Sequence, residues 1–236
     1  MAKFIKFKKV NFINGDFIEV YKKIKKGGLL VAPAASALVE IEKDKIYHNS
    51  LINSDIALFD SGFFCILLRI FKKKKVQKLS GYKFLKEFIN VKNNLDDVIL
   101  LIDPTKDDSR LNLKLLKNKK FNKVYSYISP FYKNNNSFNK DKKILKLIKQ
   151  LNPKYIIINI AGGKQEPLGF YLKKKISKKI SIICTGAAIA FLTKRQAPIN
   201  DLVDRLYLGW ALRLIYNPIN TYKRFLNSFK LIKFFF

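Results

Sequence analysis

One carboxylate stands where a strand of a parallel sheet would meet a ligand. Asp60 directly follows the apolar run Asp55–Phe59 and precedes Ser61 and Gly62. A carboxylate at such a place can remove the proton of a bound hydroxyl group, provided that the two lie within hydrogen-bond distance. An Asp just before a helix is also a good N-cap. The position alone leaves both interpretations open.

Small and polar residues follow several other apolar runs. Ligands of open parallel sheets bind beyond the carboxyl ends of the strands, and helix N-termini there offer free N–H groups to phosphates. Together these ends favour a nucleotide or sugar-phosphate ligand, although glycines at such turns also serve backbone geometry. Gln165 and Glu166 can hold sugar hydroxyls or be ordinary first-turn residues. The candidate binding residues at these ends are Pro33, Ser36, Ser61, Gly62, Gln165, Glu166, Thr185, Gly186 and Ala187.

The sequence lacks the motifs of several kinds of site. We find no Asp-x-Asp after a strand to hold a divalent ion on a diphosphate, so we expect no metal and no cofactor. A phosphate-binding P-loop motif and a complete Gly-x-Gly-x-x-Gly are absent. His48 is the sole histidine. Cys65 and Cys184 lie in apolar runs, which predicts two small buried residues rather than a disulfide framework.

Short apolar runs alternate with longer helical patterns along the chain. Continuous apolar strands between helices predict an α/β fold, Rossmann-like, with a mostly parallel sheet covered by helices on both faces. We expect a catalytic domain over residues 1–198 and a C-terminal helical appendage over 199–236. The predicted strands are 28–32, 55–59, 97–102, 123–128, 155–160 and 180–184. The predicted helices are 16–26, 34–52, 62–72, 82–91, 109–118, 140–151, 165–178 and 186–194.

The net charge is +30, which indicates a polyanionic partner such as nucleic acid, anionic lipid or a phosphorylated substrate. Only six of the 47 basic residues are Arg, and Lys, Asn, Ile and Phe are all abundant. This pattern is typical of an AT-rich genome, in which surface positions drift to Lys. Charge alone is therefore weak evidence for nucleic-acid binding, and a charge run is usually a solvated face.

The tail after Pro218 is a basic amphipathic segment that ends in three phenylalanines. Such a helix can lie in a membrane interface with its lysines near anionic head groups, or it can dock on the domain core. The N-terminus lacks the apolar core of a signal peptide, and the longest apolar run, Phe63–Leu68, is too short to span a bilayer. We expect a reducing, cytosolic setting.

Over residues 12 to 226 the chain resembles the WecG/TagA/CpsF glycosyltransferases, glycosyltransferase family 26. Each matching piece is short, but their order and spacing are specific. The pieces are Val31–Leu38, Ser54–Gly62, Lys78–Gly81, Gly163–Glu166, Thr185–Ala188 with Phe191, Gln196–Pro198, Leu208–Arg213, Asn217–Pro218 and Arg224–Phe225.

The resemblance implies a Rossmann-like fold and an inverting, metal-independent transfer of an N-acetylhexosamine-type sugar. The donor would be a UDP-sugar, and the acceptor a sugar on a polyprenyl diphosphate at the inner face of the plasma membrane. Asp60 corresponds to the proposed base of the family and Gln165 to a residue near the acceptor sugar. Lys78, Arg213 and Arg224 would face the lipid diphosphate, and the tail would close the site at the membrane.

The chain departs from the family pattern at several of these places. Ala32 and Ala34 stand where many members have Thr and Asn, so two polar contacts are absent. Gly163, Ala190 and Gly209 replace a Pro, an Asp and a Glu. We interpret these changes as a subfamily with a different sugar preference. A sugar-nucleotide-binding protein without catalysis, a basic nucleic-acid-binding protein and a homo-oligomeric state stay open alternatives.

Overall fold

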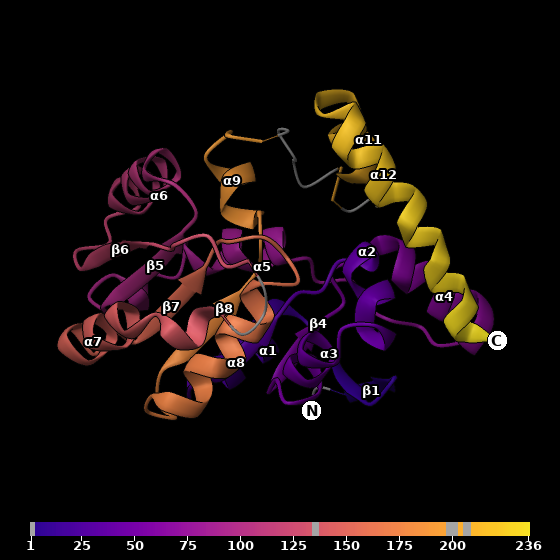
Figure 1. The fold of residues 1–236 in the computed structure, drawn as a ribbon, viewed down its shortest axis with the longest axis horizontal. Coiled ribbons are helices and arrows are strands. Elements are labelled where there is room, and N and C mark those ends of the chain that lie inside the picture. The colour runs from indigo at the N-terminus through magenta and orange to yellow at the C-terminus, as the bar shows by residue number, and fades with distance from the viewer. Residues whose placement is uncertain (1–2, 134–136, 197–202, 205–208) are drawn as a thin grey trace.

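A single eight-stranded sheet forms the centre of the computed structural model (Figure 1), which describes residues 3–133, 137–196, 203–204 and 209–236. The strand order is β1-β2-β4-β3-β8-β7-β5-β6, and all neighbours are parallel except the β1–β2 hairpin. The strands are β1 (Lys3–Phe7), β2 (Val10–Asn14), β3 (Gly28–Val31), β4 (Ile56–Leu58), β5 (Ile99–Asp103), β6 (Val124–Ile128), β7 (Tyr155–Ile158) and β8 (Ser181–Cys184). The predicted α/β class with a mostly parallel sheet is confirmed.

Helices cover both faces because the buried strand residues point alternately to either side. Leu29, Ile156 and Ile182 pack toward α3 (Lys45–Ile52), α7 (Lys142–Leu151) and α8 (Gln165–Lys175). Leu30 and Ile157 pack toward the other face. The helices on that second face are α1 (Phe17–Ile24), α5 (Gly81–Phe88), α6 (Lys106–Asn118) and α9 (Ala188–Leu192).

Each of the six predicted strands and each predicted helix corresponds to an element of the structure, but one predicted helix is divided. The region predicted as one helix over 34–52 is divided into α2 (Ala35–Leu38), the 3₁₀ turn η1 (Val39–Glu42) and α3. Asp44 interrupts it, because its carboxylate accepts the N–H of Tyr47 at 2.9 Å and caps α3.

The N-terminal hairpin was not predicted. Its first strand, Lys3–Phe7, mixes two lysines with apolar residues without a regular period, and only Phe7 is buried. β2 pairs in parallel with β4, so the hairpin extends the sheet on the side that carries Asp60.

The C-terminal segment is helical, with α11 (Gly209–Tyr216), α12 (Pro218–Phe229) and the 3₁₀ segment η4 (Lys230–Phe235). In Figure 1 it runs past α2 and ends beside α4 (Gly62–Lys72). Leu231, Phe234 and Phe235 are buried, and the Phe235 ring centroid lies 5.2 Å from that of Phe7. The end of the tail therefore docks on the core. The predicted boundary at residue 198 falls among residues 197–202, outside the described part, and stays a prediction.

The start of the C-terminal segment, unlike its buried end, exposes large apolar side chains. Ile215, Tyr216, Ile219 and Tyr222 are each more than half exposed and form what we call the apolar stripe of α11 and α12. Within the described part of the chain, no helix is both long enough and apolar enough to cross a bilayer. Cys65 and Cys184 are free and buried, as expected.

Candidate functional site

Asp60 lies at the carboxyl end of β4 and does not cap the helix that follows. The N-cap of α4 is Ser61, whose hydroxyl accepts the N–H of Phe64 at 3.3 Å. The Asp60 Oδ1 instead accepts the N–H of Gly81, the first residue of α5, at 2.8 Å. The interpretation of Asp60 as an N-cap is therefore wrong. Its half-buried carboxylate is oriented by the start of a helix that comes from elsewhere in the sequence.

The start of α5 fits closely between two strand ends. A Cβ atom at Gly81 would lie 3.1 Å from the Thr185 Cβ and 3.2 Å from the Ala32 Cβ. Both distances are shorter than ordinary contacts, so only glycine fits without moving its neighbours. Gly81 thereby joins Asp60 to the ends of β3 and β8. The strand ends that the sequence predicted to converge do lie together.

Gln165 and Glu166 form a buried network at the start of α8. The Gln165 Oε1 accepts the N–H of Gly186 at 2.8 Å, and its Nε2 donates to Glu166 Oε1 at 3.0 Å. Glu166 Oε2 accepts the N–H of Gly163 at 2.7 Å. Gly163 and Gly186 have φ values of +83° and +61°, which glycine adopts without strain. Gln165 thus ties the turn after β7 to the turn after β8, and Glu166 fixes the turn after β7 and the Gln165 amide.

The electrostatic setting of Glu166 differs from that of a surface carboxylate. Burial is the main cause that raises its pKa, and the negative charge of Asp60 adds to it, so that the pKa lies at about 7. The hydrogen bonds from Gly163 and Gln165 act in the opposite direction. Two carboxyl groups thus lie close enough to influence each other at one edge of the sheet.

The remaining candidates at the strand ends have varied surroundings. Pro33 is buried after β3, whereas Ser36 is half-buried in α2, with its carbonyl accepting from Asn227 Nδ2 at 3.3 Å. Gly62 begins α4 and Ala187 caps α9, both half-buried. Thr185 is buried, and its hydroxyl has no hydrogen-bond partner among the described residues.

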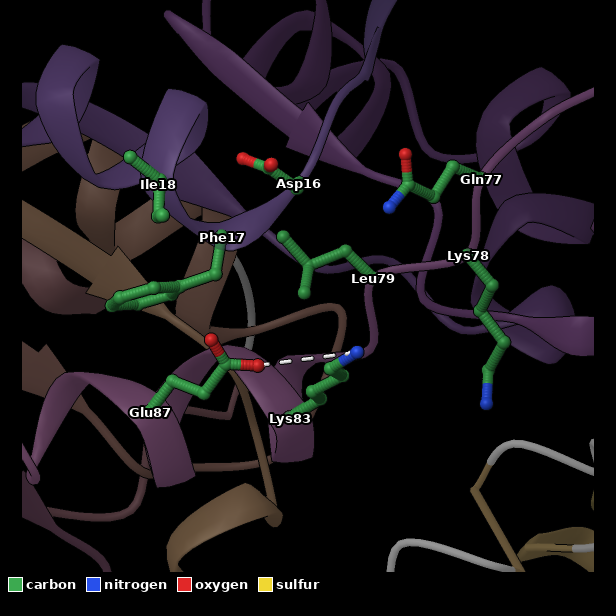
Figure 2. A pocket seen from close by; sticks show the side chains of 8 residues that line it. All are labelled: Asp16, Phe17, Ile18, Gln77, Lys78, Leu79, Lys83 and Glu87. Atoms are coloured by element: carbon green, nitrogen blue, oxygen red, sulfur yellow. Dashed lines mark ion pairs between the residues drawn. The ribbon is translucent and has the colours of Figure 1, made fainter.

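Lys78 approaches the appendage. Its Nζ lies 2.7 Å from Asp204 Oδ1, and the two side chains are 10% and 15% exposed. Lys78 also borders a small cavity of about 140 Å³ near Asp16. Figure 2 shows its side chain running out of that cavity, with the amino group directed away from Asp16 and Glu87. Lys78 therefore links the loop before α5 to residues 203–204.

A larger cavity of about 800 Å³ lies between α12 and the β7–α8 turn. Arg224, an exposed residue of α12, is part of its wall together with Ser36 and Gly163. Arg213 belongs to α11, but its side chain is outside the described part. The structure thus brings Arg224 and Ser36 together at one cavity and leaves Arg213 unplaced.

Two polar residues near the site were not among the sequence candidates. Tyr47 lines the larger cavity and is 1% exposed, although nothing in its apolar helical surroundings marks it as functional. Asp103 is fully buried at the end of β5, where it accepts from Ser126, Asn159 and Asn112, each at 2.7 Å. Burial raises the pKa of Asp103. The position of Asp103 directly after an apolar run was the sequence signal that could have identified it as a candidate.

Clusters of three or more His, Cys, Asp or Glu side chains arranged to hold a metal ion are not found among the described residues. The polar groups at the carboxyl edge are instead two interacting carboxylates, an amide, backbone N–H groups and nearby cations. Such groups can orient hydroxyls, accept a proton and neutralise phosphate.

The sheet, its helices and the polar edge define a Rossmann-like α/β protein with a ligand site at the carboxyl ends of its strands. The sequence model of the glycosyl transferase WecG/TagA/CpsF family matches residues 6–236. The chain belongs to this glycosyltransferase family of cell-surface polysaccharide synthesis. No curated protein matches the chain.

Proposed function

We propose that this chain is an inverting glycosyltransferase that uses no metal or other cofactor. It moves a sugar of the N-acetylhexosamine type from a UDP-sugar to a sugar on a polyprenyl diphosphate. The observation that carries this proposal is the Asp60 carboxylate, held at a strand end by the Gly81 N–H beside Gln165 and Glu166. Family membership supports the reaction class.

The reaction is a single displacement. Asp60 takes the proton of the acceptor hydroxyl, and that oxygen forms a bond to the anomeric carbon of the donor sugar. The bond from the anomeric carbon to the UDP oxygen breaks, and UDP leaves with the electron pair. Backbone N–H groups at the strand ends and nearby cations stabilise the charge on the leaving diphosphate.

The binding residues divide between the two substrates. Pro33, Ser61, Gly62, Thr185, Gly186 and Ala187 at the strand ends contribute to the donor site. Ser36, Gln165 and Glu166 lie toward the acceptor sugar. We assign Lys78, Arg213 and Arg224 to the acceptor diphosphate. Part of the positive charge of the chain would then serve to bind phosphate oxygens.

The acceptor carries a lipid chain, so the enzyme works at a membrane surface. We place it as a peripheral protein on the inner face of the plasma membrane, with the tail at the interface. The basic residues of α12 and the exposed apolar stripe support this orientation.

Release of UDP from a panel of UDP-sugars, with a short-chain prenyl-diphosphate-linked N-acetylglucosamine as acceptor, tests the proposal. Asp60→Asn should lower kcat at least about 100-fold, because general-base catalysis contributes about 10²–10⁴-fold. Asp96→Asn changes an exposed Asp that bonds Asn122 before β5, and should keep wild-type activity.

Full activity of Asp60→Asn would disprove the role of Asp60. A wild-type chain that binds UDP-sugars without releasing UDP would support the non-catalytic alternative. Binding to nucleic acid that weakens steeply with salt, together with indifference to UDP-sugars, would favour the nucleic-acid alternative.

A further inference from the structure

The cavity beneath α12 has two walls of opposite charge. Glu40, Asp44 and Tyr47 come from the η1–α3 side, while Lys223 and Arg224 come from α12 and Lys230 from the start of η4. Figure 1 shows α12 passing beside α2, which precedes this first wall in the chain. A volume of about 800 Å³ is within the usual range of ligand pockets. Such a cavity fits a ligand with an anionic part and a hydroxylated, uncharged part.

The Tyr47 hydroxyl is an unexplained polar group in this wall. The residue is 1% exposed, and its hydroxyl has no hydrogen-bond partner among the described residues. Leaving a buried hydroxyl unpaired costs free energy, so each such group in a folded protein needs a reason. The other end of the residue is well fixed, since its N–H donates to the Asp44 carboxylate.

The surroundings of Tyr47 keep its hydroxyl protonated. Burial raises the pKa of Tyr47 well above its ordinary value, and the charges of Glu166, Asp44 and Asp60 raise it further. The hydroxyl is thus a neutral hydrogen-bond donor within the electrostatic influence of three carboxylates. Sugars suit such a place, because their hydroxyls donate to carboxylates while their oxygens accept from a phenol.

We propose that the Tyr47 hydroxyl donates a hydrogen bond to an oxygen of the acceptor sugar, whose diphosphate lies against Lys223, Arg224 and Lys230. Tyr47 is then a specificity residue at the sugar end of the cavity. This inference rests on the proposed function, because it takes the ligand to be a sugar diphosphate. The contact of Tyr47 with the acceptor sugar is not among those that the family resemblance implies.

Binding by the full chain tests the inference without turnover. The probe is N-acetylglucosaminyl diphosphate carrying a short prenyl chain, titrated by calorimetry in the absence of any donor. Tyr47→Phe should raise Kd about tenfold or more, since a lost hydrogen bond leaves a sugar oxygen unpaired. The same variant should bind the prenyl diphosphate without sugar as tightly as the wild type.

Thermal unfolding supplies an independent readout. Tyr47→Phe removes an unpaired buried hydroxyl, so the ligand-free variant should melt at the same temperature as the wild type or higher. Tyr155→Phe is the matched control, because the Tyr155 hydroxyl is buried but donates to Asn94 Oδ1 at 3.3 Å. It should melt at a lower temperature and keep the wild-type Kd for the sugar probe.

The inference is overturned if Tyr47→Phe binds the sugar probe like the wild type, or if it weakens both probes equally. It is also overturned if the wild type does not bind the sugar probe. A wild type that binds the probe through Tyr47 yet releases UDP from no UDP-sugar would refute the proposed function and leave the inference standing.

Discussion

Glu166 combines nearly complete burial with a carboxyl group that accepts two hydrogen bonds. It is 1% exposed, and its oxygens accept from Gly163 and Gln165. A buried carboxylate loses its hydration, which favours the protonated form. The residue that fixes the turn after β7 and the Gln165 amide therefore changes its charge within the physiological pH range.

The pH dependence of folding should report this residue. Glu166 releases its proton near 4.5 in the unfolded chain but near 7 when folded. Between these values the folded state binds more protons, so the stability that Glu166 contributes is complete below pH 4.5 and is lost as pH rises through 7. The free energy of unfolding should fall by about 1.4 kcal/mol per pH unit in this window. Urea unfolding of wild type and Glu166→Gln at pH 5, 6, 7 and 8 measures it.

The variant cannot ionise at this position, so its stability relative to the wild type should increase from pH 5 to about pH 7 and level off by pH 8. Glu87→Gln is the control, because Glu87 lies on the surface of α5 in a weak pair with Lys83 at 3.9 Å. Its profile should run parallel to that of the wild type. Parallel profiles for Glu166→Gln as well would mean that Glu166 keeps an ordinary pKa.

The sequence did not decide between two roles for η4, which could dock on the core or lie in a membrane interface. Phe235 is 7% exposed and packs against Phe7, Phe64 and Phe71, while Phe236 is 92% exposed. Phe235→Ala should lower the free energy of unfolding by about 3–5 kcal/mol, since it opens a cavity in the core.

Phe236→Ala should change that free energy by less than about 0.5 kcal/mol, because little of its side chain is buried. Chemical denaturation of the two variants compares neighbouring residues of the same type. Equal losses of stability would mean that the tail end is not docked as described.

Elements with a strong pattern were predictable from the sequence. β5, β7 and β8 are buried along their whole length and mostly apolar because helices cover both sides, and their bounds were predicted within a few residues. The hairpin was missed because Lys3–Phe7 has neither a continuous apolar run nor a period of two. The helix break at Asp44 was missed because an N-cap inside an apolar pattern is not visible without knowing where the chain turns.

Only those candidate site residues that come directly after a strand could be predicted from the sequence. Asp60 and Thr185 were found this way, since topology alone brings such residues to one edge. The contact of Asp60 with Gly81 depends on how α5 packs, which no local pattern encodes. Tyr47 was missed for the same reason, because the lack of a partner for its hydroxyl is a property of the folded chain.

On the scale of the whole molecule, positive charge and exposed apolar residues occur together on the appendage. Lys223 and Arg224 lie on α12, which also carries Ile219 and Tyr222 of the apolar stripe, and Lys230 begins η4. Basic residues attract anionic head groups, and apolar side chains enter the interface. We expect the chain to bind vesicles of phosphatidylglycerol and phosphatidylcholine, more weakly at high salt.

Ile219→Ser combined with Tyr222→Ser should weaken vesicle binding at least about tenfold, because two exposed side chains leave the interface. Cosedimentation with the vesicles measures this. The control is Ile18→Ser with Tyr125→Ser, an exposed pair of the same residue types on α1 and β6. A similar loss in both double variants would show that the apolar stripe does not face the lipid.

The contact between Phe7 and Phe235 joins the two extremes of the described chain. During synthesis, the aromatic surface around Phe7 and Phe64 stays uncovered until the final helical turn has emerged from the ribosome. Contacts so distant in sequence form late and slow folding. Nascent chains of this enzyme should therefore need a chaperone on that surface longer than a protein whose N-terminal half closes its own core.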